Sequence, residues 1–340
     1  MDAFDTEMHQ QPEALRTLAR FYAGEGRARL ATAARSITAP LLTGMGASYH
    51  AAAAMLPYWH HLGIGGAAVE ATDLIYYGDW QRAHADAVVY LSQSGASAEV
   101  APLADRLPHG ATLIGVTNDA TSLLARRAAQ VLPIMAGAET LVACKTYVNS
   151  LAVLWLLGRS AAGVTDGSEM VALDAVADRI ATVLARGEAI TARWLEALGD
   201  AERLVFVGHG PQAITARHGA MMAAEWAKQA VLSMGGGAFR HGFIEIVQPG
   251  DGVVVFASPG AGAASARALA AEIGACGGRM VVVAHGETDP ALEESPADGD
   301  EEWLSPLLDV IPTQLFVRAL AAKGGVPPGF RHINKVTTRL

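Results

Sequence analysis

The sequence predicts an α/β protein made of two tandem units, each built on a parallel sheet. The chain has 340 residues, enough for two domains, and 51% of them are apolar. Apolar runs of strand length alternate with segments of helical spacing, as in parallel sheets covered by helices. Four elements of the first half also recur in the second half at one offset of about 165 residues, which indicates a duplicated domain.

The elements of the first half follow from hydrophobic spacing and from glycine-rich turns. We expect an amphipathic helix within residues 8–35, then strands at 41–44, 88–91, 112–117 and 131–135. Helices are expected after the first strand to residue 58, at 98–103, at 122–127 and at 145–157. The predicted segments are an N-terminal helix (1–35), a first domain (36–162), a linker of two helices (163–199), a second domain (200–325) and a C-terminal tail (326–340).

The second half repeats this plan with different residues at the turns. Residues 204–210 echo 41–46, 253–260 echo 88–95, 280–284 echo 113–117, and the helix over 307–322 echoes the one over 145–157. Where the first copy has Ser92-Gln93-Ser94-Gly95, the second has Ala257-Ser258-Pro259-Gly260. Proline lacks the backbone N–H and alanine lacks the hydroxyl, so we expect any anion to bind the first copy.

The first-copy turn is the strongest functional signal in the sequence. The apolar run 88–91 ends in Ser92, Ser94 and Ser97, with Gln93 and Gly95 between them. A strand that enters a helix leaves unpaired N–H groups, which together with hydroxyl donors suit a phosphate. The alternative is ordinary helix capping by serine, because serine often caps helices.

Several function classes are disfavoured by the sequence. The Gly44-Met45-Gly46 turn has Tyr49 where a dinucleotide fingerprint needs its third glycine, so we expect no NAD or other cofactor. A net charge of −9 argues against nucleic acid. Cys144 and Cys276 lack metal-like spacing and are expected to be buried free thiols. No apolar run reaches membrane length and no signal peptide is visible, so we expect a soluble cytoplasmic protein without a membrane partner.

The turn Ser92-Gln93-Ser94-Gly95 resembles the phosphosugar-binding loop of the SIS (sugar isomerase) domain family, especially in the isomerase half of glucosamine-6-phosphate synthases. The resemblance covers about residues 36–340 and implies two three-layer αβα units. It also implies a set of phosphate-binding residues: Ser48, Ser92, Gln93, Ser94 and Ser97.

Three further positions match the catalytic groups of that family. The resemblance implies that Glu225 moves a proton between C1 and C2, that His241 opens the sugar ring, and that Lys335 forms a Schiff base or positions the open chain. Taken alone, the residues leave other interpretations: a surface Glu225–Lys228 pair, a loop histidine and a solvated tail lysine. The sequence departs from the synthase pattern at two positions: Met222 stands in place of a Lys and His218 in place of a Glu. We therefore expect this chain to bind its substrate differently from the synthases.

These features predict an enzyme that acts on a phosphorylated amino sugar. The chain shows no glutamine amidotransferase segment, so we expect deamination or deglycation in place of glutamine-driven synthesis. A fructosamine-phosphate deglycase, a simple ketose–aldose isomerase and a phosphosugar-sensing module are the alternatives. Small residues in the 220–227 helix and the 235–237 loop favour a C2 homodimer, and the resemblance implies shared active sites.

Overall fold

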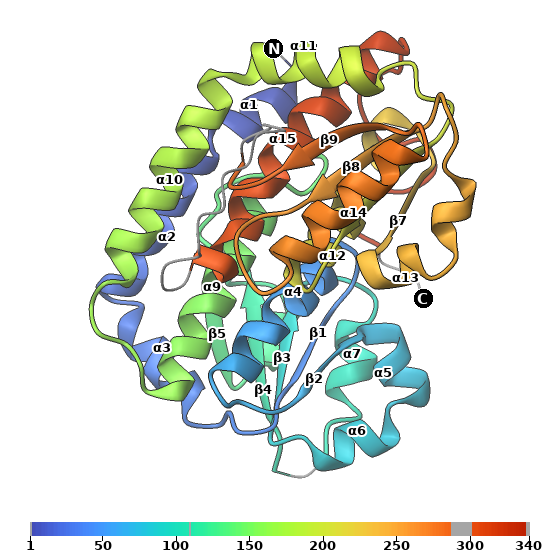
Figure 1. The fold of residues 1–340 in the computed structure, drawn as a ribbon. Helices are drawn as coiled ribbons and strands as arrows, with labels where there is room; N and C mark the ends of the chain where they lie inside the picture. The colour runs from blue at the N-terminus through green and yellow to red at the C-terminus, as the bar shows by residue number, and fades with distance from the viewer. Residues whose placement is uncertain (1, 109, 287–300, 338–340) are drawn as a thin grey trace. The chain divides into compact units, whose positions relative to one another are not determined.

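The computed structural model describes residues 2–108, 110–286 and 301–337, which divide into two compact units (Figure 1). The first unit comprises residues 10–177 and the tail from Arg331. The second comprises the N-terminal segment to His9 and residues 178–330. Each contains one fully parallel sheet, as the sequence predicts.

The sheet of the first unit has the order β2-β1-β3-β4-β5. Its strands are β1 (Leu41–Gly44), β2 (Ala67–Glu70), β3 (Ala87–Leu91), β4 (Thr112–Thr117) and β5 (Gln130–Pro133). The chain runs outward from β1 to β2 and then returns to place β3 on the other side of β1. The carboxyl ends of β1 and β3 therefore form a topological switch point, the usual position of a ligand crevice in such sheets.

Helices cover both faces of this sheet. They are α2 (Gln11–Ala23), α3 (Arg27–Ala34), α4 (Ala47–His61), α5 (Ala71–Tyr77), α6 (Asp79–His84), α7 (Val100–Ala104), α8 (Leu123–Arg127), α9 (Lys145–Ala162) and α10 (Glu169–Ala185), the last of which continues into the second unit. Helix α9 is buried along nearly its whole length and packs against α4. There the Trp59 indole N–H donates to the Leu154 carbonyl at 3.0 Å, so its polar group is satisfied inside the core.

The second unit repeats the topology of the first. Its strands are β6 (Leu204–Gly208), β7 (Val231–Gly235), β8 (Gly252–Phe256) and β9 (Arg279–Val283), in the order β7-β6-β8-β9. Its remaining elements are α1 (Ala3–His9), α11 (Gly187–Leu198), α12 (Pro211–Met222), a π-helix (Ala223–Ala227), α13 (Gly236–Arg240), a 3₁₀ helix (Phe243–Ile246), α14 (Ala263–Ala275) and α15 (Glu301–Lys323). This strand order matches β2-β1-β3-β4 of the first unit, as a duplication requires.

Some expected elements differ in the structure. The single helix expected within 8–35 is interrupted: α1 ends at His9, α2 ends at Ala23, and α3 starts after the turn Gly24-Glu25-Gly26. The helix expected from residue 98 begins only at Val100 and lasts five residues. The two helices expected between 163 and 199 are α10 and α11.

Three further observations bear on protein class. Among the described helices, α15 alone is long and apolar enough to cross a membrane, but 94% of that stretch is buried, as in the core helix of a soluble protein. Both cysteines are free, but Cys276 is exposed, so the expectation that it is buried is wrong. Across the described ranges, no group of three or more His, Cys, Asp or Glu side chains could hold a metal ion.

Candidate functional site

The serine loop (residues 92–97) follows β3 at the switch point of the first unit. Its backbone is fixed to the neighbouring strand, because the Ser92 N–H donates to the Val116 carbonyl and the Asn118 N–H donates to the Gln93 carbonyl, both at 3.0 Å. Gly95 has φ +59°, and a Cβ there would lie 2.1 Å from Ser122 Oγ. This position therefore requires glycine.

The hydroxyls of this loop are arranged to donate. Ser92 Oγ accepts the Gly95 N–H at 3.1 Å, and Ser94 Oγ accepts the Ala96 N–H at 3.2 Å. A serine hydroxyl has one hydrogen to donate besides its lone pairs, so both hydrogens stay available for an anion. Because α7 starts only at Val100 and is short, the donors come from the loop and not from a helix N-terminus as the sequence suggested.

Ser97 and Ser48 lie at the same edge of the sheet. Ser97 Oγ is 3.0 Å from the hydroxyl of Tyr90, a side chain of β3 that is only 1% exposed. Burial raises the pKa of Tyr90 well above its usual range, so its phenol stays protonated and can donate to Ser97. Ser48, in the first turn of α4, is drawn toward β3 because Gly44 has no side chain: a Cβ there would lie 2.8 Å from both Leu91 O and Ser48 Cβ.

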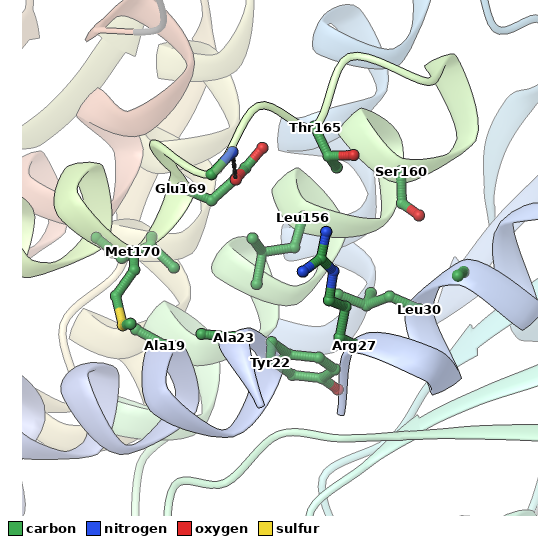
Figure 2. A pocket seen from close by; sticks show the side chains of 13 residues that line it. Ala19, Tyr22, Ala23, Arg27, Leu30, Leu156, Ser160, Thr165, Glu169 and Met170 are labelled. Carbon is green, nitrogen blue, oxygen red and sulfur yellow. Dashed lines mark hydrogen bonds between the residues drawn. The ribbon is translucent and has the colours of Figure 1, made fainter. Parts of the chain in front are cut away.

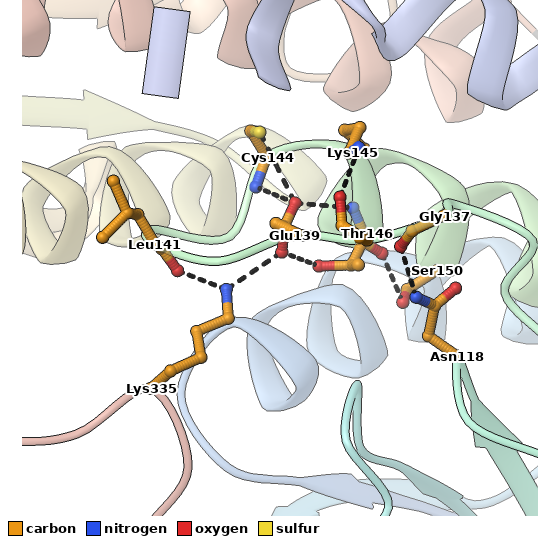
Figure 3. A network of polar contacts seen from close by, with 10 residues as sticks. Asn118, Gly137, Glu139, Leu141, Cys144, Lys145, Thr146, Ser150 and Lys335 are labelled. Carbon is orange, nitrogen blue, oxygen red and sulfur yellow. Dashed lines mark hydrogen bonds and ion pairs between the residues drawn. The ribbon is translucent and has the colours of Figure 1, made fainter. Parts of the chain in front are cut away.

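The C-terminal tail brings Lys335 to this edge of the first unit. Lys335 Nζ lies 3.0 Å from Glu139 Oε2 and also donates to the Leu141 carbonyl (Figure 3). The side chain of Lys335 is 22% exposed, and that of Glu139 is fully buried. The interpretation of Lys335 as a solvated tail charge is therefore wrong.

Glu139 connects the tail to the start of α9. Its Oε1 accepts the N–H groups of Cys144 and Thr146 at 3.0 and 3.1 Å, and its Oε2 accepts the Thr146 hydroxyl at 2.5 Å (Figure 3). The carboxylate thus satisfies N–H groups that a helix start leaves unpaired, while it also neutralises the ammonium.

A second contact fixes the tail against the serine loop itself. The Ala98 N–H donates to the Thr337 carbonyl at 3.0 Å. Lys335 is two residues from Thr337, and two residues span at most about 7 Å. The first unit therefore brings together Ser48, the serine loop and Lys335.

Glu225 and His241 belong to the second unit. Glu225 is half-buried on the π-helix that follows α12, a local irregularity often found at functional sites. Lys228 ends this π-helix at φ +57° and donates to the backbone carbonyls of Glu225 and, at 2.7 Å, Gly329. His241 caps the carboxyl end of α13 and is exposed.

The second copy of the serine loop is occupied by the chain's own carboxylate. Glu302 Oε1 accepts the Ala261 N–H at 3.0 Å. A Cβ on Gly260 would lie 2.3 Å from the Glu302 carboxyl carbon, so the glycine makes room for this side chain. This supports the prediction that an external anion binds the first copy.

A second carboxylate, Asp309, lies buried behind that loop. It accepts the Gly286 N–H at 2.7 Å, the Gln212 amide at 2.6 Å and the Ser258 hydroxyl. Burial raises the pKa of Asp309 to about 6. The folded state therefore binds a proton more tightly than the unfolded chain. This group stabilises the fold below pH ~4, and that contribution is lost as the pH rises through ~6.

Sequence reasoning missed Glu139 and Tyr90. Glu139 lies in a segment without hydrophobic periodicity, six residues before α9, and nothing in its neighbours indicates a buried carboxylate. A signal for Tyr90 did exist: it stands two residues before Ser92 in β3, so both side chains project to the same face of the sheet.

The fold and the loop define a class: a duplicated parallel α/β protein with a hydroxyl-rich loop at the switch point of one sheet. The chain belongs to the SIS domain family, whose family model matches residues 39–159 and 197–323. The two matched ranges contain the two sheets.

Sequence and structural similarity to known proteins covers nearly the whole chain. Glutamine–fructose-6-phosphate aminotransferase (isomerizing) 1 of Arabidopsis thaliana is 27% identical over 94% of this chain and 51% of its own length. The chain spans about half the length of the curated relatives it matches. The C-terminal domain of glucosamine-fructose-6-phosphate aminotransferase from Francisella tularensis matches with a TM-score of 0.84 and 19% identity over 97% of this chain and 98% of that one. Glucosamine-6-phosphate deaminase from Thermotoga maritima matches with a TM-score of 0.75 and 20% identity over 99% of both chains.

Proposed function

We propose that this protein is a phosphosugar isomerase/deaminase acting on a phosphorylated amino sugar such as glucosamine 6-phosphate. The observation that carries the proposal is the serine loop, in which Ser92 and Ser94 accept loop N–H groups and keep their hydroxyl hydrogens for an anion. Membership of the SIS domain family and the similarity to a glucosamine-6-phosphate deaminase support it.

In this proposal the sugar phosphate binds the first-unit residues Ser48, Ser92, Gln93, Ser94 and Ser97. Neutral donors suit a phosphate because hydrogen bonds to a charged acceptor are worth about 1.5–3 kcal/mol each. Tyr90 positions Ser97 through the hydrogen bond between their hydroxyl groups and does not contact the phosphate itself.

The chemistry proposed for the remaining groups is proton transfer. His241 protonates the ring oxygen and takes the anomeric proton as the ring opens. Glu225 removes the C2 proton and returns it to C1, while one proton moves from the C2 amine to the carbonyl oxygen O1; together these transfers convert the open-chain amino aldose into a C2 imine with a C1 hydroxyl. Water then adds to the imine carbon and the C–N bond breaks, which releases ammonia and leaves the ketose phosphate.

The environment of Lys335 favours a positioning role over Schiff-base formation. A Schiff base needs a neutral amine, whereas Glu139 and the Leu141 carbonyl both stabilise the charged ammonium. The ammonium can instead stabilise negative charge on the carbonyl oxygen during enolisation.

The test is incubation of the purified protein with glucosamine 6-phosphate and an assay for free ammonia and ketose phosphate. Ammonia release that disappears in Glu225→Gln is the expected result. Ketose formation without ammonia would indicate a simple isomerase, and turnover only of fructosamine 6-phosphate would indicate a deglycase. A sensing module would bind the phosphosugar without turnover, and absence of turnover with every C6-phosphorylated amino sugar or adduct would refute the enzyme proposal.

We also propose a homodimer in which His241 reaches the partner's site. If so, Glu225→Gln and His241→Asn homodimers are each nearly inactive, because every site lacks one group. Co-refolding equal amounts gives about half heterodimers, each with one intact site of two, so about a quarter of wild-type activity returns. A mixture that stays inactive, with heterodimers demonstrated by mass spectrometry, would place both groups of one chain in the same site.

A further inference from the structure

The first unit contains a cavity remote from the serine loop. It has a volume of about 430 Å³ and lies between α2, α3, the last turn of α9 and the start of α10 (Figure 2). This volume is within the range of about 300–1,000 Å³ typical of small-molecule sites. Ser160 lines the cavity, whereas Thr146 on the same helix binds Glu139; at 1.5 Å per residue they lie about 20 Å apart along α9.

The lining of the cavity is amphipathic. Its apolar wall includes Ala19, Leu30, Leu156 and Leu173, all buried. Its polar lining consists of the Arg27 guanidinium, the hydroxyls of Ser160 and Thr165, the Glu169 carboxylate and the Tyr22 hydroxyl, which donates to the Pro133 carbonyl (Figure 2). Apolar walls with a few placed polar groups are the usual composition of a ligand site.

The two charged side chains in the lining, Glu169 and Arg27, differ in whether they have partners within the protein. Glu169 is fully engaged: its Oε1 binds Arg159 Nε at 3.0 Å, and its Oε2 accepts the Gly167 N–H at 3.0 Å. Arg27 is exposed, and its side chain forms no ion pair or hydrogen bond with any residue that the structure describes. Its guanidinium points toward Leu156 and Ser160 (Figure 2). Arg27 is therefore the charged lining side chain that is left without a protein partner among the described residues, and a guanidinium binds carboxylate or phosphate through two parallel hydrogen bonds.

We propose that this cavity is an accessory binding site for a small amphipathic anion. The apolar body of the ligand packs against α2 and α9, and its single carboxylate or phosphate pairs with Arg27, with Ser160 and Thr165 as further donors.

The test is calorimetric titration of the full chain with octanoate, which carries an eight-carbon apolar body and one carboxylate. We expect saturable binding that Arg27→Gln weakens about tenfold or more. Arg29→Gln, which removes the same charge two residues away on α3 and outside the cavity, should bind as wild type. Ala23→Trp, at an exposed lining position, should abolish binding by filling the cavity.

Two further ligands distinguish the headgroup and the role of charge. Octyl phosphate is titrated into a Ser92→Ala/Ser94→Ala variant, so that the serine loop does not contribute, and tighter binding than octanoate would identify phosphate as the preferred group. 1-Octanol should bind at least tenfold more weakly than octanoate. Equal binding of 1-octanol and octanoate, equal affinity of wild type and Arg27→Gln, or no binding of either anion would overturn the proposal. None of these readouts depends on turnover, so the result is independent of the catalytic proposal.

Discussion

Replacement of Glu139 by Gln should release the C-terminal tail while leaving the start of α9 capped. The two carboxylate oxygens serve different partners. Oε1 accepts the N–H groups of Cys144 and Thr146, whereas Oε2 accepts Lys335 Nζ and the Thr146 hydroxyl. In Gln, Oε1 still accepts the backbone N–H groups, but an NH₂ group replaces Oε2 and faces the ammonium.

The size of the effect follows from burial. Removal of one partner from a buried ion pair costs about 3–5 kcal/mol, because the other charge is left uncompensated. Lys335 is 22% exposed and keeps its bond to the Leu141 carbonyl, so solvent compensates part of that loss. We therefore expect tail docking to weaken by about 2 kcal/mol, which is a factor of about 30 in the docking equilibrium.

The Ala98 amide reports on this docking, because its N–H donates to the Thr337 carbonyl. Hydrogen exchange at Ala98 should be about 30-fold faster in Glu139→Gln than in wild type. Lys335→Met should give a similar increase in the exchange rate. The double variant should exchange no faster than either single variant, because both substitutions remove the same ion pair. The matched control is Glu169→Gln, which should leave Ala98 exchange unchanged. A folded Glu139→Gln protein whose Ala98 exchanges within threefold of wild type would refute the reasoning.

Three other variants test the loop and its second copy. The Ser92→Ala/Ser94→Ala double variant should still fold and should raise the KM for glucosamine 6-phosphate by about 100-fold or more, and an unchanged KM would place the phosphate elsewhere. Gly95→Ala should lower stability by about 2–3 kcal/mol, because its Cβ would clash with a serine hydroxyl 2.1 Å away; Gly137→Ala, at φ +68° with open space, should cost only about 1 kcal/mol in denaturant unfolding. As the pH rises from 4 to 7, the free energy of unfolding of Asp309→Asn should increase by about 3 kcal/mol relative to that of wild type. The variant lacks the carboxyl group whose protonation the folded state favours. A constant stability difference across that range would contradict this.

The sequence predicts the strands and the repeat well because both are local patterns. Strand 112–117 and the buried helix from Lys145 are rich in apolar residues, and the structure has both, with the helix continuing to Ala162. Strands β2 and β7 were not predicted, because Ala67-Ala68-Val69-Glu70 has neither an apolar run nor clean alternation. Their strand conformation depends on pairing with β1 and β6, which is a tertiary effect.

The site was predictable to the extent that its chemistry lies in consecutive residues. The serine loop could be identified because its hydroxyl residues directly follow one strand. The structure adds the backbone N–H groups from which these hydroxyls accept hydrogen bonds. The partner of Lys335 could not be identified, because Glu139 is 196 positions away in sequence and only the fold brings the two together. Roles for Glu225 and His241 stay predictions, since they depend on the family resemblance.

The loops at the equivalent edge of the two sheets have different hydrogen-bond partners. In the first copy, Ser92 and Ser94 accept loop N–H groups and keep donors for an anion from outside the chain. In the second, the Ala261 N–H already binds the Glu302 carboxylate, and Ser258 donates to Asp309. Buried polar groups must be paired, and in the second copy these internal carboxylates satisfy the loop donors. On the proposed function, the duplication therefore leaves one of the two equivalent loops for a sugar phosphate, because carboxylates of α15 already occupy the loop of the second copy.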